Sequence, residues 1–282
     1  MISVIVTAYN REQFIQETLE SILSQDFADY ELIVADDCSV DATFQLATSF
    51  QTRFRDIKLY RNDRNLGQFP NRNFAASKSS GEYVLFVDSD DTIKPGTFSY
   101  LAGIISQYPS IDFFIINKQH NPGGCIQMTP AEAFKHHFFQ KSILHIGPGG
   151  TLIKKSLFDE IEGFPECYGV AGDMYYNLMA ASKSDILLLD NDYLNYRIHE
   201  GQEINKAYEY LVYGYHYFND ILSRNDIPLS AEEKRGLLDK SRKRFLLNTL
   251  RYAIKRKSVN LIFQAFRDVQ FKVSDFQKAV FS

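Results

Sequence analysis

Residues 3–39 read SVIVTAYNREQFIQETLESILSQDFADYELIVADDCS, and this stretch indicates the fold class. Two short runs rich in β-branched residues flank an amphipathic segment, which is the pattern of a strand, a helix and a second strand. The alternation continues through DATFQLATSF, IKLYRN, PNRNFAASKS and YVLFVDSD, up to residue 90. Because helices that join parallel strands produce this pattern, the sequence predicts an α/β fold with a mostly parallel sheet flanked by helices.

Polar residues follow three of the predicted strands, at the point where each strand ends. They occupy residues 7–10, 36–41 and 88–92. In open α/β sheets, ligands bind outside the carboxyl ends of the strands. We therefore expect the three segments to line one crevice.

The composition is that of an ordinary globular protein. The chain has 282 residues, 45% of them hydrophobic and 23% charged, with a net charge of −4. A basic excess is absent, so nucleic-acid binding is not expected. The three cysteines match no metal-ligand spacing, a strand rather than a signal peptide opens the chain, and no apolar run approaches the ~20 residues of a membrane span. These features predict a cytoplasmic protein with reduced thiols.

The regular alternation weakens beyond residue 95. We expect helices at about 95–106, from Thr129, near Leu157 and at about 174–182, and strands at 111–117, 185–190 and 193–199. The capping-box pattern opens helices at Thr129 and Ser230. The glycine-rich piece GPGGTLIKK (147–155) predicts tight turns. From about residue 204 only helical periodicity continues, which predicts a helical appendage.

The stretch YVLFVDSDDTI (83–93) ends in three carboxylates, those of Asp88, Asp90 and Asp91. Two carboxylates ~4 Å apart repel by roughly 1 kcal/mol in water and roughly 4 kcal/mol at a dielectric of 20, so a bound cation is expected there. Mg²⁺ and Mn²⁺ bind through one or two carboxylates together with a substrate's phosphates. The alternative is a solvated strand end in which aspartates favour the turn. An EF-hand is excluded because Ile93 and Ser99 replace its glycine and glutamate.

Two common nucleotide-binding patterns are absent. The segment VTAYNRE follows the first strand, where a Walker loop or a G-x-G-x-x-G turn would stand. This argues against an NTPase and a dehydrogenase. Tyr9 offers a face for a base and Asp37 an acceptor, although a tyrosine at a strand end also serves packing.

Four ordered segments carry a resemblance to a known family: residues 3–43, NLGQFPNRNFAASKSSGEYVLFVDSDD, GFPECYGVAGDMYYNL and YRIH. Together they resemble the family 2 glycosyltransferases, inverting enzymes of the Rossmann-like GT-A fold that use nucleotide sugars. The resemblance covers about residues 1–200. It implies a catalytic domain over 1–204, with about 1–118 binding the nucleotide sugar and about 119–204 on the acceptor side, followed by the helical region 205–282.

The resemblance implies a donor site made of residues that match the family's motifs, namely Thr7, Ala8, Tyr9, Asn10, Asp37, Arg72, Asp88 and Ser89. Tyr9 would lie against the nucleobase, Asp37 would accept a hydrogen bond from its N3–H, and Arg72 would face the phosphates. Asp88 and Asp90 would form the D-x-D pair: Asp90 would bind Mn²⁺ or Mg²⁺, Asp88 would bind the ribose or the metal, and His199 would lie near the metal or diphosphate. Asp173 would be the catalytic base.

Some positions depart from the family pattern or allow another interpretation. Gly172-Asp173 stands where relatives carry Glu-Asp, which leaves Asp173 as the sole local candidate for the catalytic base. Cys38 stands where relatives often carry glycine. Asp173 could instead complement the N-terminus of its helix, and His199 could be a structural histidine. The Q-x-x-R-W signature of processive members is absent, so a single-addition transferase is expected.

The predicted reaction is the transfer of one sugar, from a UDP-sugar by resemblance, to a glycan or lipid-linked acceptor in polysaccharide biosynthesis of the cell envelope. The alternatives are a nucleotidyltransferase-like enzyme and a non-catalytic nucleotide-sugar-binding protein on the same fold. The first would show a glycine-rich basic loop where TAYNRE stands, and the second could lose the metal aspartates and the base, which this chain retains.

Residues 234–272 carry a strong basic excess. They include twelve Lys or Arg against two acids, Asp239 and Asp268, a local net charge of +10. Apolar residues are interleaved with these bases, which predicts amphipathic helices in peripheral contact with the cytoplasmic membrane face. In the alternative, the apolar residues pack on the catalytic domain or a partner subunit and the bases form a solvated face.

Overall fold

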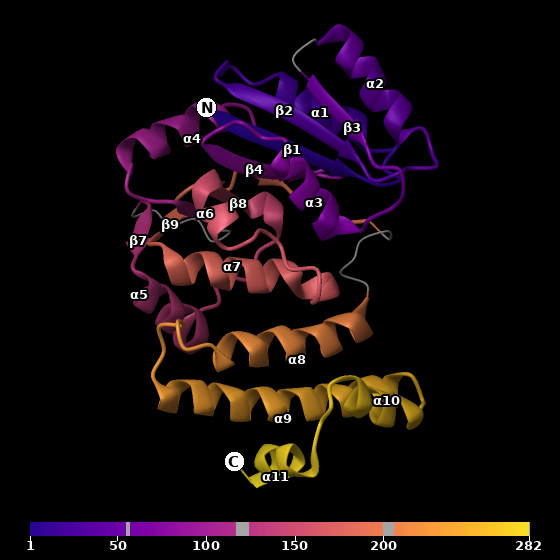
Figure 1. Cartoon of the computed structure of the whole chain (residues 1–282), viewed down its shortest axis with the longest axis vertical. Helices are drawn as coiled ribbons and strands as arrows, with labels where there is room; N and C mark the ends of the chain where they lie inside the picture. Colours follow the sequence, from indigo (N-terminus) through magenta and orange to yellow (C-terminus); the bar gives the residue numbers. More distant parts are fainter. Residues whose placement is uncertain (55–56, 117–123, 200–205, 282) are drawn as a thin grey trace.

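The computed structural model describes residues 1–54, 57–116, 124–199 and 206–281 (Figure 1). Its main sheet has eight strands, in the order β3 (Ile57–Arg61), β2 (Tyr30–Asp36), β1 (Ile2–Ala8), β4 (Tyr83–Asp88), β8 (Thr151–Lys154), β6 (Phe113–Ile116), β9 (Ile186–Leu189) and β7 (Ile126–Met128). The first four are parallel, as are β6 and β9. β8 and β7 pair antiparallel with their neighbours. The predicted α/β fold with a mostly parallel sheet is confirmed.

Helices cover both faces of this sheet. One face is covered by α1 (Ile15–Leu23), α2 (Thr43–Arg53) and α4 (Thr97–Gln107), and the other by α3 (Gln68–Ser77), α5 (Pro130–Lys135), α6 (Lys155–Glu160) and α7 (Gly172–Lys183). Alternate strand residues point to opposite faces. Accordingly, Val4 and Val34 pack with the first group of helices, whereas Ile5 and Ile33 pack with the second.

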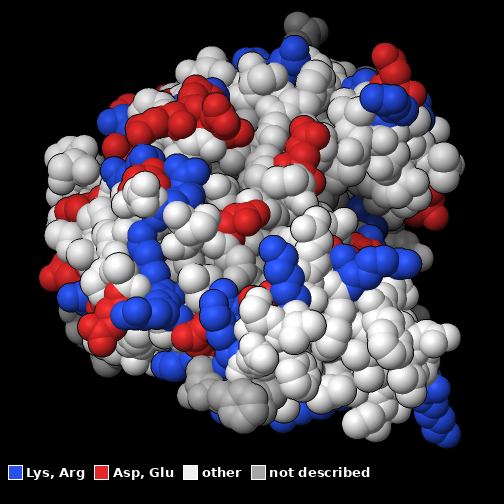
Figure 2. Space-filling view, turned by 60° about the horizontal axis from the view of Figure 1, so that its bottom comes forward, with Lys and Arg blue, Asp and Glu red and all other residues white. Residues whose placement is uncertain are grey.

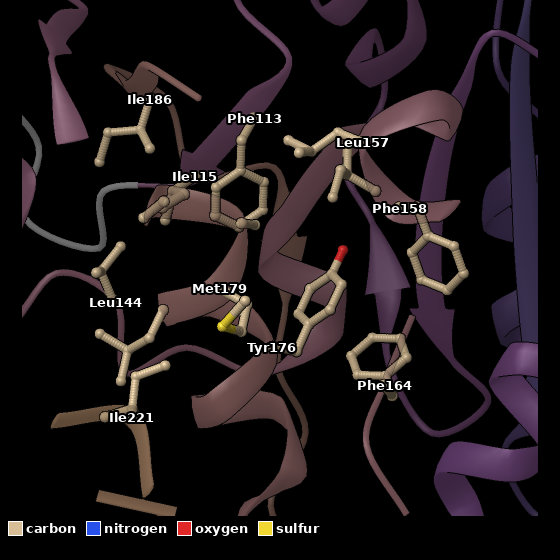
Figure 3. Packing of buried hydrophobic residues seen from close by; sticks show 14 of the residues in the cluster. Phe113, Ile115, Leu144, Leu157, Phe158, Phe164, Tyr176, Met179, Ile186 and Ile221 are labelled. Carbon is tan, nitrogen blue, oxygen red and sulfur yellow. The ribbon is translucent and has the colours of Figure 1, made fainter. Parts of the chain in front are cut away.

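The core beneath α7 fixes the position of that helix (Figure 3). The ring of Tyr176 is fully buried and stacks on Phe164 with ring centroids 4.1 Å apart. Phe113 and Phe158 contact the same ring edge-on or tilted, at 6.2 and 5.9 Å. Because closely packed interiors resist displacement, the first turn of α7 is held against the sheet.

The C-terminal helices continue the layering below α7 (Figure 1): α8 (Ala207–Ser223), α9 (Ala231–Lys255), α10 (Asn260–Asp268) and α11 (Val273–Phe281). Phe218 and Ile221 of α8 join the core that contains α7, and Phe245 of α9 lies in a second cluster with Val212 and Ala265. The predicted helical region is therefore confirmed and packs on the α/β part of the chain. The expected boundary at 204/205 lies outside the described residues.

Several local predictions are confirmed and others are wrong. Both capping boxes form, at Thr129 and Ser230. The strand expected over 193–199 is reduced to β10 (Leu194–Asn195), which pairs with the two-residue strand β5 (Thr92–Ile93). Beyond it, the backbone is diverted because the Arg197 N–H donates to the carboxylate of Asp91. The sequence interpretation also missed β7 and β8, which are short.

Two predictions about the chain as a whole can be compared with the described residues. All three cysteines are free thiols. Within the described ranges, no helix combines the length and the apolar character that a membrane crossing requires.

Candidate active site

The polar ends of three strands meet at one edge of the sheet. β1 lies between β2 and β4, with Thr7 opposite Asp88 and Ala8 opposite Asp36. The Asp37 N–H donates to the Ala8 carbonyl at 2.8 Å, which ties the two loops together. The predicted meeting of these strand ends at one edge of the sheet is confirmed.

The aspartates after β4 have cationic partners within the chain. Asp88 forms an ion pair with Arg72 of α3. One oxygen of Asp90, Oδ2, contacts Arg11 Nε at 3.0 Å and His199 Nε2 at 2.9 Å. Repulsion among the carboxylates was the reason to expect a bound cation, and these side chains offset much of it. Charge repulsion among these aspartates therefore does not by itself require a bound cation.

Asp91 has a different role from its two neighbours. Its side chain is buried, and its Oδ1 accepts the Arg197 N–H at 2.9 Å. The pKa of Asp91 is raised to about 7, mainly by burial and in part by the nearby Asp88 and Asp90, against the opposing effect of that hydrogen bond. The Thr18 hydroxyl also donates to the Asp91 carbonyl at 2.7 Å. Asp91 thus connects α1, this loop and the segment that carries His199.

An aromatic and cationic group closes one side of the crevice. The ring of His199 stacks on Phe14 at 4.7 Å, and the Arg197 guanidinium lies over the same phenylalanine at 5.5 Å. Arg197 also forms an ion pair with Glu17 at 2.8 Å. A cavity of about 310 Å³ lies here, lined by residues 10–14, Asp41 and His199.

The loop after β1 presents an exposed aromatic ring. Tyr9 is 43% exposed, so its face is available to a ligand. Asn10 has a φ of 53° and is held by the loop after β2: its N–H donates to Ser39 Oγ and its Oδ1 accepts from the Val40 N–H, both at 2.9 Å. Cys38 has a φ of 63°, a left-handed conformation that glycine adopts at low cost. Cys38 thus adopts a backbone conformation that favours glycine.

The carboxylate of Asp37 is buried and already has three donors. Oδ1 accepts from the Leu66 N–H and Asn62 Nδ2, both at 2.8 Å, and Oδ2 accepts from the Gly67 N–H at 2.9 Å. In this conformation Asp37 holds the loop before α3 against β2. Its role toward a nucleobase stays a prediction.

Asp173 lies in the first turn of α7, close enough to Arg72 and Asp88 for both to influence its pKa. Burial raises its pKa to about 7. Its Oδ1 accepts the Met174 N–H at 2.8 Å, which opposes the rise, as does Arg72, whereas Asp88 adds to it. Asp173 is thus electrostatically coupled to the Arg72–Asp88 pair. A carboxylate with a pKa near neutrality is suited to general base catalysis.

The structure explains why residue 172 is glycine. A Cβ atom at Gly172 would lie 2.6 Å from the Phe69 ring and 2.9 Å from the Pro165 carbonyl oxygen. There is no room for a larger side chain at this position, so Asp173 has no carboxylate beside it at residue 172.

We expect Gly172→Ala to destabilise the fold by about 1–3 kcal/mol, because the new methyl group overpacks a backbone contact. Urea unfolding monitored by circular dichroism measures the change. Gly236→Ala is the matched control, since a Cβ at Gly236 in α9 meets nothing within 4 Å. That substitution should stabilise by up to about 1 kcal/mol through helix propensity. Equal stability of the Gly172→Ala variant and the parent would contradict the close contact.

Sequence reasoning missed three side chains of the site: Arg11, Phe14 and Arg197. Arg11 directly follows the segment predicted to bind the nucleobase. A basic residue so close to acidic loops could have indicated that it belongs to the site. Arg197 stands two residues before His199 in YRIH, which was considered for its histidine alone. Phe14 carried no signal, because an aromatic residue before a helix is most often core.

The D-x-D pair retains open oxygens that suit a divalent cation. Asp88 Oδ1 is taken by Arg72 and Asp90 Oδ2 by Arg11 and His199, whereas no described residue donates a hydrogen bond to the other oxygen of either carboxylate. Within the described part of the chain, no group of three His, Cys, Asp or Glu side chains is placed to hold a metal alone. These residues therefore fit a cation that also takes ligands from a bound diphosphate.

Comparison with known sequences identifies one family. Residues 3–162 match the sequence model described as Glycosyl transferase family 2. The chain is 31% identical over 217 residues to the poly(ribitol-phosphate) beta-N-acetylglucosaminyltransferase TarS of Staphylococcus aureus. The aligned region covers 73% of this chain and 37% of TarS. It is 31% identical over 185 residues to a GalNAc(5)-diNAcBac-PP-undecaprenol beta-1,3-glucosyltransferase of Campylobacter jejuni, covering 63% of this chain and 59% of that protein. The chain thus spans little more than a third of TarS.

Solved structures show the same fold. The crystal structure of S. aureus TarS 1-349 in complex with UDP-GlcNAc superposes with a TM-score of 0.68 and 24% identity, covering 99% of this chain and 78% of that one. The mannosyltransferase PcManGT of Pyrobaculum calidifontis superposes with a TM-score of 0.62 and 17% identity, covering 99% and 83%.

Proposed function

The chain belongs to glycosyl transferase family 2, and from this premise we propose that it transfers one sugar from a UDP-sugar to a hydroxyl group of a glycan or lipid-linked acceptor, with inversion. One observation carries the proposal: Asp173, with a pKa raised to about 7, lies beside the Arg72–Asp88 pair at the end of β4. A candidate base therefore lies close to residues suited to a diphosphate.

The relatives support the choice of substrates. TarS was crystallised with UDP-GlcNAc, and its name gives a poly(ribitol-phosphate) acceptor. The Campylobacter relative is named for an undecaprenol-linked acceptor and transfers glucose. A hexose or N-acetylhexosamine donor and a cell-envelope polymer or its lipid-linked precursor are thus the substrates that we propose.

In the proposed mechanism, the Asp173 carboxylate accepts the proton of the acceptor hydroxyl as its oxygen attacks the anomeric carbon. The bond from that carbon to the UDP oxygen breaks in the same displacement, so the configuration inverts and no sugar is bound covalently to the enzyme. A positioned base of this kind is most effective when its pKa is close to the working pH.

The leaving diphosphate requires positive charge, and Arg72 and Arg11 supply it from the chain's own residues near the D-x-D pair. A Mn²⁺ or Mg²⁺ ion held by Asp88 and Asp90 would act as a Lewis acid on the same phosphates. The solved structure of PcManGT is a complex with GDP-Man and Mn²⁺, which supports a metal in this fold. His199 contacts Asp90 and orients its carboxylate; a direct ligand role for His199 stays a prediction.

Incubation with Mn²⁺ and a panel of UDP-, GDP- and CMP-sugars tests the proposed function. We expect slow hydrolysis of one UDP-sugar. A non-catalytic nucleotide-sugar-binding protein would bind one member of the panel without releasing the nucleotide. Pyrophosphate-dependent formation of a nucleoside triphosphate would instead indicate a nucleotidyltransferase.

The activity should depend on pH through Asp173. The base acts in its deprotonated form, so kcat/KM should fall by about tenfold per unit as the pH drops below about 7. Measuring kcat/KM for the hydrolysed UDP-sugar at pH values below and above 7 gives the acid limb of the pH–rate profile, the part in which the rate falls with pH.

Asp91 also has a pKa raised to about 7, so Asp91→Asn is the matched control for that limb. If Asp173 is the base, Asp91→Asn keeps the acid limb near pH 7. Loss of the limb in this variant would assign the titration to Asp91.

A further inference from the structure

Three large apolar side chains are exposed around the turn between α9 and α10. Ile254 is 76% exposed, Val259 67% and Phe263 68%. Single exposed apolar residues are normal on protein surfaces, but a cluster bordered by polar residues marks an interaction site. We call residues 251–263 the α9–α10 tip.

Basic side chains flank this apolar cluster. Arg251, Lys255, Arg256 and Lys257 are all exposed, and no carboxylate of a described residue forms an ion pair with any of them. By contrast, Arg242 in the middle of α9 is paired with Asp239 and Asp275, at 2.8 and 3.0 Å. The tip thus combines uncompensated positive charge with apolar surface.

Other parts of the basic segment 234–272 lack this combination of uncompensated positive charge and exposed apolar surface. Phe245 and Leu246 of α9 are 3% and 8% exposed, so they belong to the core against α8. The Arg244 guanidinium lies over the Phe218 ring at 5.4 Å. The prediction of helices that lie flat on a membrane is therefore wrong for this part of α9, where the packing alternative holds.

The tip lies on the active-site side of the molecule. Tyr208, near the start of α8, contacts the Tyr252 ring at 5.8 Å and donates to Asp268 at 2.7 Å. Figure 1 shows α10 and the carboxyl ends of β1 and β2 on the same, right-hand side. Figure 2 brings the helical end forward and shows Lys and Arg spread across it, with a broad uncharged area at the lower right.

We propose that the α9–α10 tip binds an anionic membrane surface. Ile254, Val259 and Phe263 enter the headgroup region, while Lys255 and Lys257 contact anionic lipid. Amphipathic surfaces bind membranes through buried apolar area together with attraction to anionic lipid. If the proposed function holds, this orientation brings the crevice close to a lipid-linked acceptor; the membrane binding itself does not depend on that function.

Two other occupants fit the tip less well. A soluble polyanion attracts the bases but offers no apolar phase for Ile254 and Phe263. A second copy of the chain, placed by a two-fold axis through the tip, would bring like charges together, which opposes association. A bilayer with anionic headgroups complements both features.

The chain contains no tryptophan, so Phe263→Trp provides a single fluorescent reporter at the tip. Its emission should shift to shorter wavelength with vesicles of phosphatidylcholine and phosphatidylglycerol, and not with phosphatidylcholine alone. Phe139→Trp is the matched control, because Phe139 is 46% exposed and follows α5, away from the tip. Its emission should stay unchanged with both kinds of vesicle.

Co-sedimentation with the same vesicles measures the role of charge. Lys255→Gln/Arg256→Gln/Lys257→Gln should weaken partitioning about 100-fold, since a basic residue at an anionic surface contributes about 1 kcal/mol, or about fivefold. The control removes three exposed bases in the first half of α9, Arg235→Gln/Lys240→Gln/Lys243→Gln, and should weaken it less than about tenfold. High salt should weaken binding of the parent chain through screening.

Three outcomes would overturn the proposal. The first is failure of the parent chain to sediment with anionic vesicles at low salt. The second is a combination of three results: both triple variants weaken sedimentation equally, Phe263→Trp shows no emission shift, and polyphosphate competes with the vesicles. This combination would indicate a polyanion site. The third is a dimer by light scattering in which Phe263→Trp emission is already shifted without vesicles, which indicates a second copy.

Discussion

Asp173→Asn should retain UDP binding and lose at least about 100-fold in transfer rate, because a positioned general base contributes roughly 10²–10⁴-fold. Asparagine has the size of aspartate and can accept the same Met174 N–H, so the first turn of α7 should stay in place. Its amide cannot take the acceptor's proton. Steady-state transfer kinetics and calorimetry with UDP measure the two effects separately.

Asp185→Asn is the control for this substitution, since Asp185 hydrogen-bonds Gln127 at the surface and should leave both quantities unchanged. Near-normal turnover of Asp173→Asn would place the base elsewhere. His145 would then be examined first: burial lowers its pKa to about 4, which keeps it neutral, and its Nε2 lies 3.3 Å from Tyr217 Oη. Burial raises the pKa of Tyr217, and the nearby carboxyl of Asp173 adds to that rise.

Removing the divalent cation should have a comparably large effect on donor binding. A metal ion that neutralises a diphosphate contributes several kcal/mol, so EDTA should lower the affinity for UDP at least about 100-fold. Asp90→Asn should lose most of the metal-dependent affinity, because it removes the charge on a carboxylate whose Oδ1 receives no hydrogen bond from a described residue. Calorimetry with UDP, with and without Mn²⁺, measures both.

Asp91→Asn separates the metal effect from a general loss of negative charge. Asp91 is buried and bonded to the Arg197 N–H, so its replacement should preserve the response to Mn²⁺. Equal affinity for UDP with and without metal in the parent chain would contradict the assignment. In that case Arg11 and Arg72, which already pair with the D-x-D carboxylates, would hold the diphosphate alone.

The candidate site could be predicted in outline but not in its contacts. The residues 7–10, 36–41 and 88–92 were expected to meet, because strand ends are readable from local patterns and parallel strands end at one edge. The partners of the aspartates were not readable. Arg11 is 79 residues from Asp90 in sequence, and no local pattern links the two. A cation was expected from charge repulsion alone. The fold instead places arginines beside these aspartates, and the sequence itself did not indicate this.

Local patterns in the sequence were enough to predict the alternating strands and helices, the parallel half of the sheet and both capping boxes. Each of these features depends on neighbours within a few residues. Only the tertiary structure determined the insertion of β8 between β4 and β6, the lack of space at Gly172 and the division of α9 into a buried middle and an exposed end. Periodicity shows that a helix has an apolar face, but what covers that face depends on segments far away in the chain.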